Sequence, residues 1–111
     1  MLFRSKDEIL EALRRVYDPE IPVDIVNLGL VYDVQIGEGV VHLKMTTTAP
    51  GCPVGNMIGA EARKAIRDLA EAKGIGAGRE AMPEVQVELV YDPPWDEARV
   101  SKDGRRMLGW E

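Results

Sequence analysis

The chain has 111 residues, of which 45% are hydrophobic and 30% charged, and its net charge is −5. We expect residues 1–111 to form one domain that buries roughly two-thirds of its unfolded surface. The acidic balance disfavours nucleic acid as a partner, because phosphate contacts need clustered Lys and Arg. No apolar run approaches the roughly 20 residues that span a bilayer, and the charged N-terminus does not resemble a signal peptide. A single cysteine excludes an intrachain disulfide, so the expected location is the cytoplasm, away from membranes.

The first predicted element is a helix that starts at a capping box in Ser5–Glu8. Apolar residues follow at helical spacing. The helix is expected to end near Tyr17, because Asp18 precedes a proline and is pushed out of helical geometry. Residues 18–22 form a stiff turn, and the apolar segment 23–29 is predicted to be a loop or a short helix.

Alternating apolar and polar residues predict strands over 30–36, 41–45 and 85–89. A tight hairpin joins the first two strands. A long amphipathic helix is expected from Pro53 to Gly74, and a short helix after Ser101. A hairpin gives an antiparallel pair and a helical crossover gives a parallel one. The predicted fold class is therefore α+β, a small two-layer domain with helices packed on a mixed three-stranded sheet.

Cys52 is the only cysteine, and it lies where the second strand pattern gives way to the long helix. A thiol at a helix start meets the positive end of the helix dipole, which favours the thiolate. A buried structural cysteine is the alternative. Gly51 permits close backbone approach and Pro53 fixes the loop, while Thr47 and Thr48 supply hydroxyls and amides nearby. This context favours a functional thiol.

Carboxylates form the second candidate group. Asp18 and Glu20 are ordinary turn residues in one interpretation. If the turn folds back on the Cys52 loop, they orient a partner, act as acid or base, or help to bind a metal beside the thiolate. His42, the only histidine, is predicted on the outward face of a strand, so a nucleophile–base pair with Cys52 is a weaker alternative. Two Cys or His residues are too few for a structural zinc site.

Four segments, taken in order, resemble the SufT/PaaD-like family, the MIP-type iron–sulfur assembly domain. They are Asp18–Glu20, Val23–Val31, Thr46–Pro53 and Pro93–Trp95. The resemblance covers nearly the whole chain and implies a small α/β domain that takes part in iron–sulfur protein maturation. It further implies that Asp18, Glu20, Thr48 and Cys52 form a shared site.

An iron–sulfur cluster needs about four thiolate-type ligands, and one chain supplies one. We therefore expect no stably bound cofactor, but transient contact between Cys52 and iron or a cluster. A homodimer would pair two Cys52 thiols, and client proteins or a small thiol would complete the set.

Three hypotheses follow. The first is a non-enzymatic assembly factor that works with the iron–sulfur machinery and client apo-proteins, with Trp95 or the sheet edge docking a partner. The second is a small cysteine-dependent enzyme with Asp18 or Glu20 as base, which ranks lower because no resolving cysteine is present. The third is a plain interaction module in which Cys52 only packs. A maturation or interaction module for a phenylacetate-type oxygenase complex is a further alternative.

Overall fold

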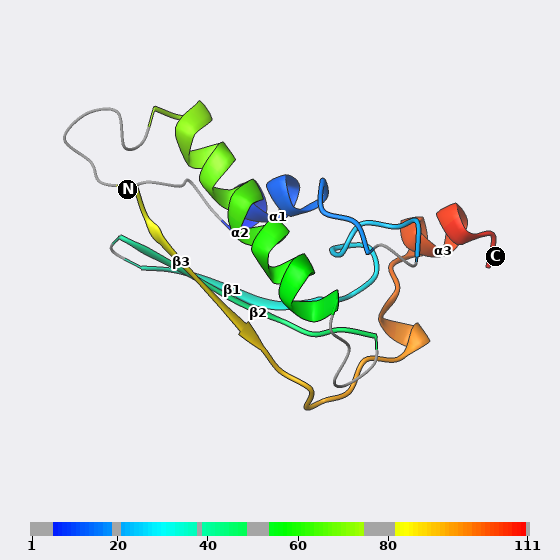
Figure 1. Ribbon diagram of the computed structural model, residues 1–111. Coiled ribbons are helices and arrows are strands. Elements are labelled where there is room, and N and C mark those ends of the chain that lie inside the picture. Colours follow the sequence, from blue (N-terminus) through cyan, green and yellow to red (C-terminus); the bar gives the residue numbers. More distant parts are fainter. Residues whose placement is uncertain (1–5, 19–20, 38, 49–53, 75–81, 111) are drawn as a thin grey trace.

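The computed structural model describes residues 6–18, 21–37, 39–48, 54–74 and 82–110. In chain order the elements are α1 (Lys6–Leu13), β1 (Val31–Gly37), β2 (Val40–Met45), α2 (Val54–Ala72), β3 (Glu84–Leu89), the 3₁₀ helix η1 (Glu97–Arg99) and α3 (Lys102–Leu108) (Figure 1). None of these helices is both long and apolar enough to cross a membrane.

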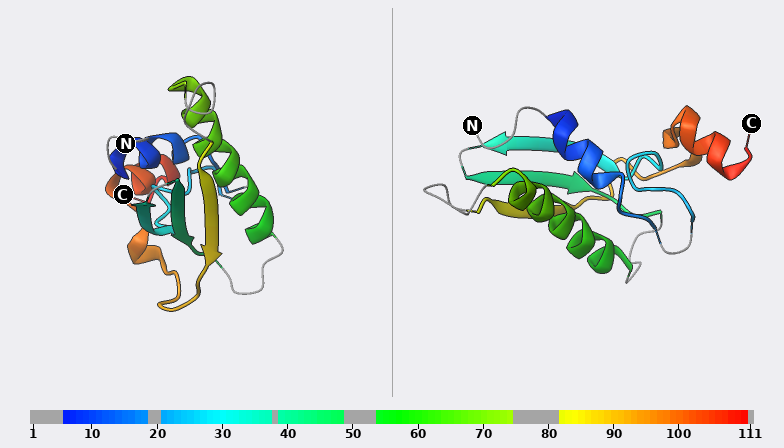
Figure 2. Two further views of the ribbon diagram at one scale, coloured as in Figure 1. Left: turned by 90° about the vertical axis from the view of Figure 1, so that its left-hand side faces the viewer. Right: turned by 90° about the horizontal axis from the view of Figure 1, so that it is seen from above.

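The three strands form one mixed sheet in the order β1-β2-β3. β1 and β2 are antiparallel, with Val34 opposite Leu43, and β2 and β3 are parallel, with Leu43 opposite Val87. Helices α1 and α2 cover the same face of this sheet (Figure 2). The predicted α+β class, with a hairpin and a helical crossover, is confirmed.

The core lies between this pair of helices and the sheet. Ile9 and Leu13 of α1, Ile58 and Ile66 of α2 and Leu43 of β2 are at most 1% exposed. These positions recur at helical spacing in the helices and alternate along the strand, as the apolar pattern of the sequence predicts. Burial of the two helical stripes against the sheet is what positions α2.

The opposite face of the sheet is polar. His42 of β2 lies there, and its Nε2 is 3.1 Å from Glu88 Oε1 on the neighbouring strand β3. The predicted outward position of His42 is confirmed, and the side chain pairs across strands on this face.

Helix α1 ends at Leu13, earlier than the predicted end near Tyr17. The backbone beyond the helix makes other contacts: Ile25 N–H donates to Val16 O at 2.9 Å, and Tyr17 forms a bridge with Asp24. A tertiary pairing, which local sequence signals do not contain, therefore shortens the helix.

The C-terminal tail, by which we mean residues 90–110 after β3, contains the helix predicted after Ser101. Ser101 is its N-cap and accepts a hydrogen bond from Gly104 N–H at 2.9 Å, and Gly109 ends it with φ +73°. The preceding η1 was not predicted. Asp96 caps it by accepting from Ala98 N–H at 2.9 Å, so a short Asx-type turn rather than an apolar pattern defines this element.

Candidate functional site

The candidate site lies at the end of the sheet where β1 begins and β2 ends. The strand register places Val31 opposite Met45 at this end. The segment that follows β2 leads to the start of α2, and the segment that follows α1 contains Asp18 (Figure 1). The Asp18 segment and the segment after β2, both of which the sequence singles out, therefore lie near the same end of the sheet.

Backbone hydrogen bonds join these two segments through the turn between them. Ile25 N–H donates to Val16 O at 2.9 Å, and Leu30 N–H donates to Ile25 O at 3.0 Å. Thr46 N–H then donates to Leu30 O at 2.8 Å. The Asp18 turn and the threonine segment are thus both fixed to residues 25–30.

Asp18 is 7% exposed, an uncommon position for a carboxylate. Its Oδ1 accepts a hydrogen bond from Ile21 N–H at 3.3 Å, which closes the turn that Pro22 stiffens. The carboxylate therefore has a structural use in shaping its own turn, whatever else it binds.

The threonines after β2 are also buried. Thr46 is fully buried and Thr47 is 3% exposed, whereas Thr48 is half-buried. Burial increases the strength of any polar interaction that these groups make. Thr46 and Thr47 therefore lie inside the fold at the point where the chain leaves the sheet.

The other predicted site residues, Glu20, Gly51, Cys52 and Pro53, lie outside the described residues. Among the described residues, no group of three or more His, Cys, Asp or Glu side chains has the geometry to hold a metal ion. The shared site with Asp18, Glu20, Thr48 and Cys52 stays a prediction, of which the structure places Asp18 and Thr48.

A second polar cluster, which we call the buried turn, is formed by residues 24–29. Asp24 is 3% exposed and accepts from Asn27 through both oxygens, from Nδ2 at 2.7 Å and from the backbone N–H at 3.1 Å. The sequence predicts this segment only as a loop or a short helix and indicates no role for Asp24 or Asn27. The sequence signal for this cluster is a carboxylate and an amide, Asp24 and Asn27, that lie three residues apart within an apolar segment.

The tail is fastened to the buried turn. Ser101 donates through Oγ to Asn27 Oδ1 at 2.6 Å, and through its N–H to Asn27 O at 2.8 Å. Trp95 donates from its indole N–H to Leu28 O at 2.7 Å. Gly29 has φ +79°, and a Cβ atom there would lie 2.3 Å from Arg99 O. Two of the four family-like segments, 23–31 and 93–95, therefore contact each other.

The tail also contacts β1 through Tyr32. Tyr32 donates from its hydroxyl to Pro93 O at 2.8 Å, and the Arg99 guanidinium lies 4.5 Å from the centre of the Tyr32 ring. Trp95 itself is half-buried and packs against the core. Its expected role in docking a partner stays a prediction.

Together, the fold and these segments define a class of small α+β protein with a mixed three-stranded sheet, whose only thiol, Cys52, follows the central strand in the sequence. The model of the family described as "Iron-sulfur cluster assembly protein" matches residues 6–77. The chain therefore belongs to this SufT-like family of iron–sulfur assembly domains, as the sequence resemblance predicted.

Similar proteins extend the match to the tail. The Fe-S protein maturation auxiliary factor YitW of Bacillus subtilis is 43% identical over 105 residues, which are 94% of this chain and 93% of that protein. The Fe-S protein maturation auxiliary factor SufT of Staphylococcus aureus is 36% identical and covers 85% of this chain and 97% of its own length. A crystal structure of a domain of unknown function from Bacillus anthracis superposes with a TM-score of 0.80 at 33% identity, covering 95% of this chain and 92% of that one.

Proposed function

We propose that this protein is a non-enzymatic auxiliary factor that helps to assemble iron–sulfur clusters or to deliver them to client proteins. The observation that carries the proposal is the family match over residues 6–77, which contains the only cysteine of the chain. The names of the relatives at 36–43% identity support the same role.

In this proposal Cys52 is the residue that contacts the cargo, iron or a cluster. A cluster is held by about four thiolate-type ligands, and this chain has one Cys and one His. The remaining ligands therefore come from a client, a small thiol or a second copy of the chain. A cargo held by so few ligands of the factor is released readily, which suits a protein that passes its cargo on.

The carboxylates of Asp18 and Glu20 assist the thiol. A carboxylate near the cargo adds an oxygen ligand or accepts a proton when a thiol of the client deprotonates. Burial of Asp18 supports this assignment, because a carboxylate in a shielded position acts more strongly on a nearby charge than an exposed one.

The test is complementation of a strain that lacks the gene. We expect lowered activity of several iron–sulfur enzymes under iron limitation, restored by the wild-type gene but not by Cys52→Ser. His42→Ala is the matched control, because it removes the only imidazole of the chain, which lies on the outer face of the sheet. Full restoration by a stably folded Cys52→Ser variant would contradict the proposal.

Reconstitution provides a second measurement. The purified protein is mixed with iron, sulfide and an apo-ferredoxin, and the visible absorption of the client's cluster is followed over time. The wild-type protein is expected to raise the rate of cluster formation and Cys52→Ser is not. Equal rates with both proteins would assign the thiol a packing role.

A further inference from the structure

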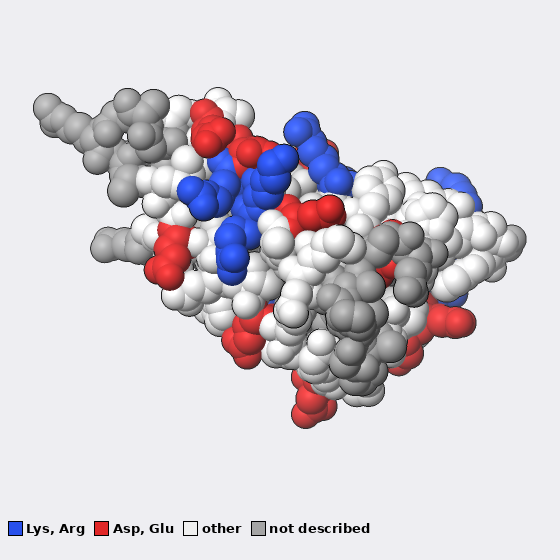
Figure 3. All heavy atoms as spheres, in the orientation of Figure 1, with Lys and Arg blue, Asp and Glu red and all other residues white. Residues whose placement is uncertain are grey.

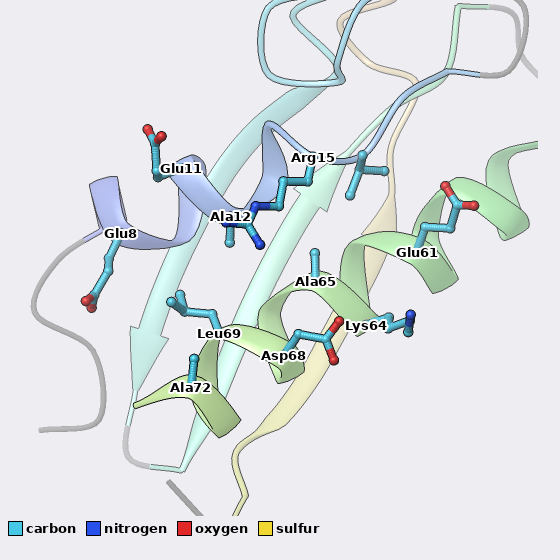
Figure 4. Close-up of a pocket in the computed structure, with 11 residues that line it drawn as sticks. Glu8, Glu11, Ala12, Arg15, Glu61, Lys64, Ala65, Asp68, Leu69 and Ala72 are labelled. Carbon is cyan, nitrogen blue, oxygen red and sulfur yellow. The ribbon is translucent and has the colours of Figure 1, made fainter. Parts of the chain in front are cut away.

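A groove of about 620 Å³ lies between α1 and α2, on the side of the helices that faces away from the sheet. Its floor is apolar and made of small side chains. Ala12 of α1 points toward α2, and Ala65, Leu69 and Ala72 of α2 point toward α1 (Figure 4). Small side chains between two helices leave room for the ridge of a third helix.

The rim of the groove is charged, with an excess of acid. The charged lining residues are Glu8, Glu11, Glu61 and Asp68 against Arg15 and Lys64. Glu11 is paired with Arg14 at 3.2 Å, but both side chains are more than half exposed, so this pair is weak and exchangeable. Lys, Arg, Asp and Glu side chains lie intermixed over these helices in Figure 3.

The two ends of the groove differ. At one end Lys73 Nζ lies 2.6 Å from Glu8 Oε2 and links α2 to α1. At the other end the lining residue Val16 is followed by Tyr17, which is 52% exposed, and Met57, one turn before Glu61, is 50% exposed. The open end therefore has exposed apolar side chains and leads to the Asp18 turn.

We propose that this groove docks an amphipathic helix of a partner protein, with an apolar ridge on the floor and Lys or Arg side chains against the acidic rim. Helix-in-groove docking needs these two features, an apolar floor and complementary flanking charge. The lining of α2 from Glu61 to Ala72 is about 16 Å long, which is three turns of such a helix. The inference rests on the proposed function in one respect: the docked partner is the client or assembly protein that approaches the end of the sheet from which the Cys52 segment leaves.

A second copy of this chain is a poorer occupant. Among the described helices, α1 and α2 bury their apolar faces on their own sheet, and α3 has only seven residues. Two copies, each with a net charge of −5, also repel one another. The partner is therefore a different, more basic protein segment.

The test is titration of the isotope-labelled protein with a Leu/Lys amphipathic peptide of about 18 residues, which is long enough to be helical in water. We expect the amide signals of Ala12, Ala65 and Leu69 to shift, and a Leu/Glu peptide of the same pattern to leave them unchanged. The double variant Glu61→Lys with Asp68→Lys is expected to weaken peptide binding about tenfold. The matched control, Glu71→Lys with Glu84→Lys, changes the net charge equally at exposed residues that do not line the groove and is expected to stay within about twofold.

Three results would overturn the groove assignment: equal weakening by the control pair, equal binding of the Leu/Glu peptide, or shifts that fall outside the groove. Shifts of the groove signals that follow protein concentration without any peptide would identify a second copy as the occupant and overturn it as well. Cys52→Ser is titrated in parallel and is expected to bind the peptide with unchanged affinity. If no peptide binds in the groove but Cys52→Ser still does not complement the deletion strain, the docking proposal is wrong and the proposed function stands. The failure of one proposal is therefore distinguishable from the failure of the other.

Discussion

The buried turn and the β1–β2 hairpin use the same residue types in different ways. In the buried turn an amide donates to a carboxylate, Asn27 to Asp24 at 2.7 Å, with Asp24 only 3% exposed. On the hairpin Gln35 donates to Asp33 at 3.1 Å at an exposed position. Each region also has a glycine with positive φ, Gly29 and Gly39. The difference is that Asn27 of the buried turn also bonds to Ser101 in the tail, whereas the Gln35–Asp33 hydrogen bond stays within β1.

This contrast shows that residue type alone does not determine what a polar group contributes. An exposed hydrogen bond exchanges with water and adds little, whereas a buried group that loses its partner costs its full desolvation. The hairpin is therefore expected to tolerate substitutions that the buried turn does not. Paired substitutions at matched positions measure this difference directly.

The largest difference is expected between the two glycines. Gly29→Ala places a Cβ atom 2.3 Å from the backbone oxygen of Arg99, in addition to the strain of φ +79°. We expect it to lower the free energy of unfolding by about 3 kcal/mol in a denaturant titration. Gly39→Ala has a similar φ of +69° with no atom within 4 Å, and we expect a loss of about 1 kcal/mol. Equal losses would show that the approach of Arg99 does not constrain the turn.

An intermediate difference in unfolding free energy is expected between Asn27→Ala and Gln35→Ala. Asn27→Ala removes the donor to Asp24 and the acceptor of the Ser101 hydroxyl, and it leaves a buried carboxylate with fewer partners. We expect a loss of about 2 kcal/mol of unfolding free energy. Gln35→Ala, its exposed counterpart, is expected to change stability by less than about 0.5 kcal/mol.

The Asn27 contact with Ser101 is also testable as a pair. A double-mutant cycle with Asn27→Ala and Ser101→Ala is expected to give a coupling of about 1 kcal/mol, because the two side chains share one hydrogen bond. Additive losses would mean that Ser101 acts only as the N-cap of α3.

The sequence predicted the strands, the long helix and the helix after Ser101, because apolar periodicity and capping residues are local signals. It also placed His42 on the outer face. It did not predict the early end of α1 or the role of residues 24–29, because both depend on hydrogen bonds between segments that are distant in the chain. For the candidate site, the sequence drew attention to Asp18 and Thr46–Thr48, and backbone hydrogen bonds through residues 25–30 connect these segments.

The Pro93–Trp95 segment shows why such long-range roles escape sequence reasoning. Two prolines and a tryptophan are consistent with a core residue, a lid or a docking residue. The contact that separates these alternatives, between the Trp95 indole and Leu28 O, joins residues that no local pattern connects. Trp95 is therefore the residue at which the two uses, fastening the tail and docking a partner, have to be measured separately.

The smallest of the paired differences in stability is expected between Trp95→Phe and Trp110→Phe. Phenylalanine keeps an aromatic ring in the half-buried site but removes the indole N–H that donates to Leu28 O at 2.7 Å, so we expect a loss of about 1 kcal/mol of unfolding free energy. Trp110→Phe is the matched control, because Trp110 is 44% exposed and its hydrogen bond to Arg105 O uses only the backbone N–H. We expect this control to leave stability unchanged.

The rate of alkylation of Cys52, the only thiol, is measured for both variants across a range of pH. If the tail only fastens the buried turn, the alkylation profile of Trp95→Phe coincides with that of the wild type. The pH profile of alkylation is measured at a temperature where the variant is fully folded. A shift of this profile relative to the wild type would show that the tail also acts on the threonine segment, through Leu30 and Thr46. The tail and the threonine segment would then not be independent of each other.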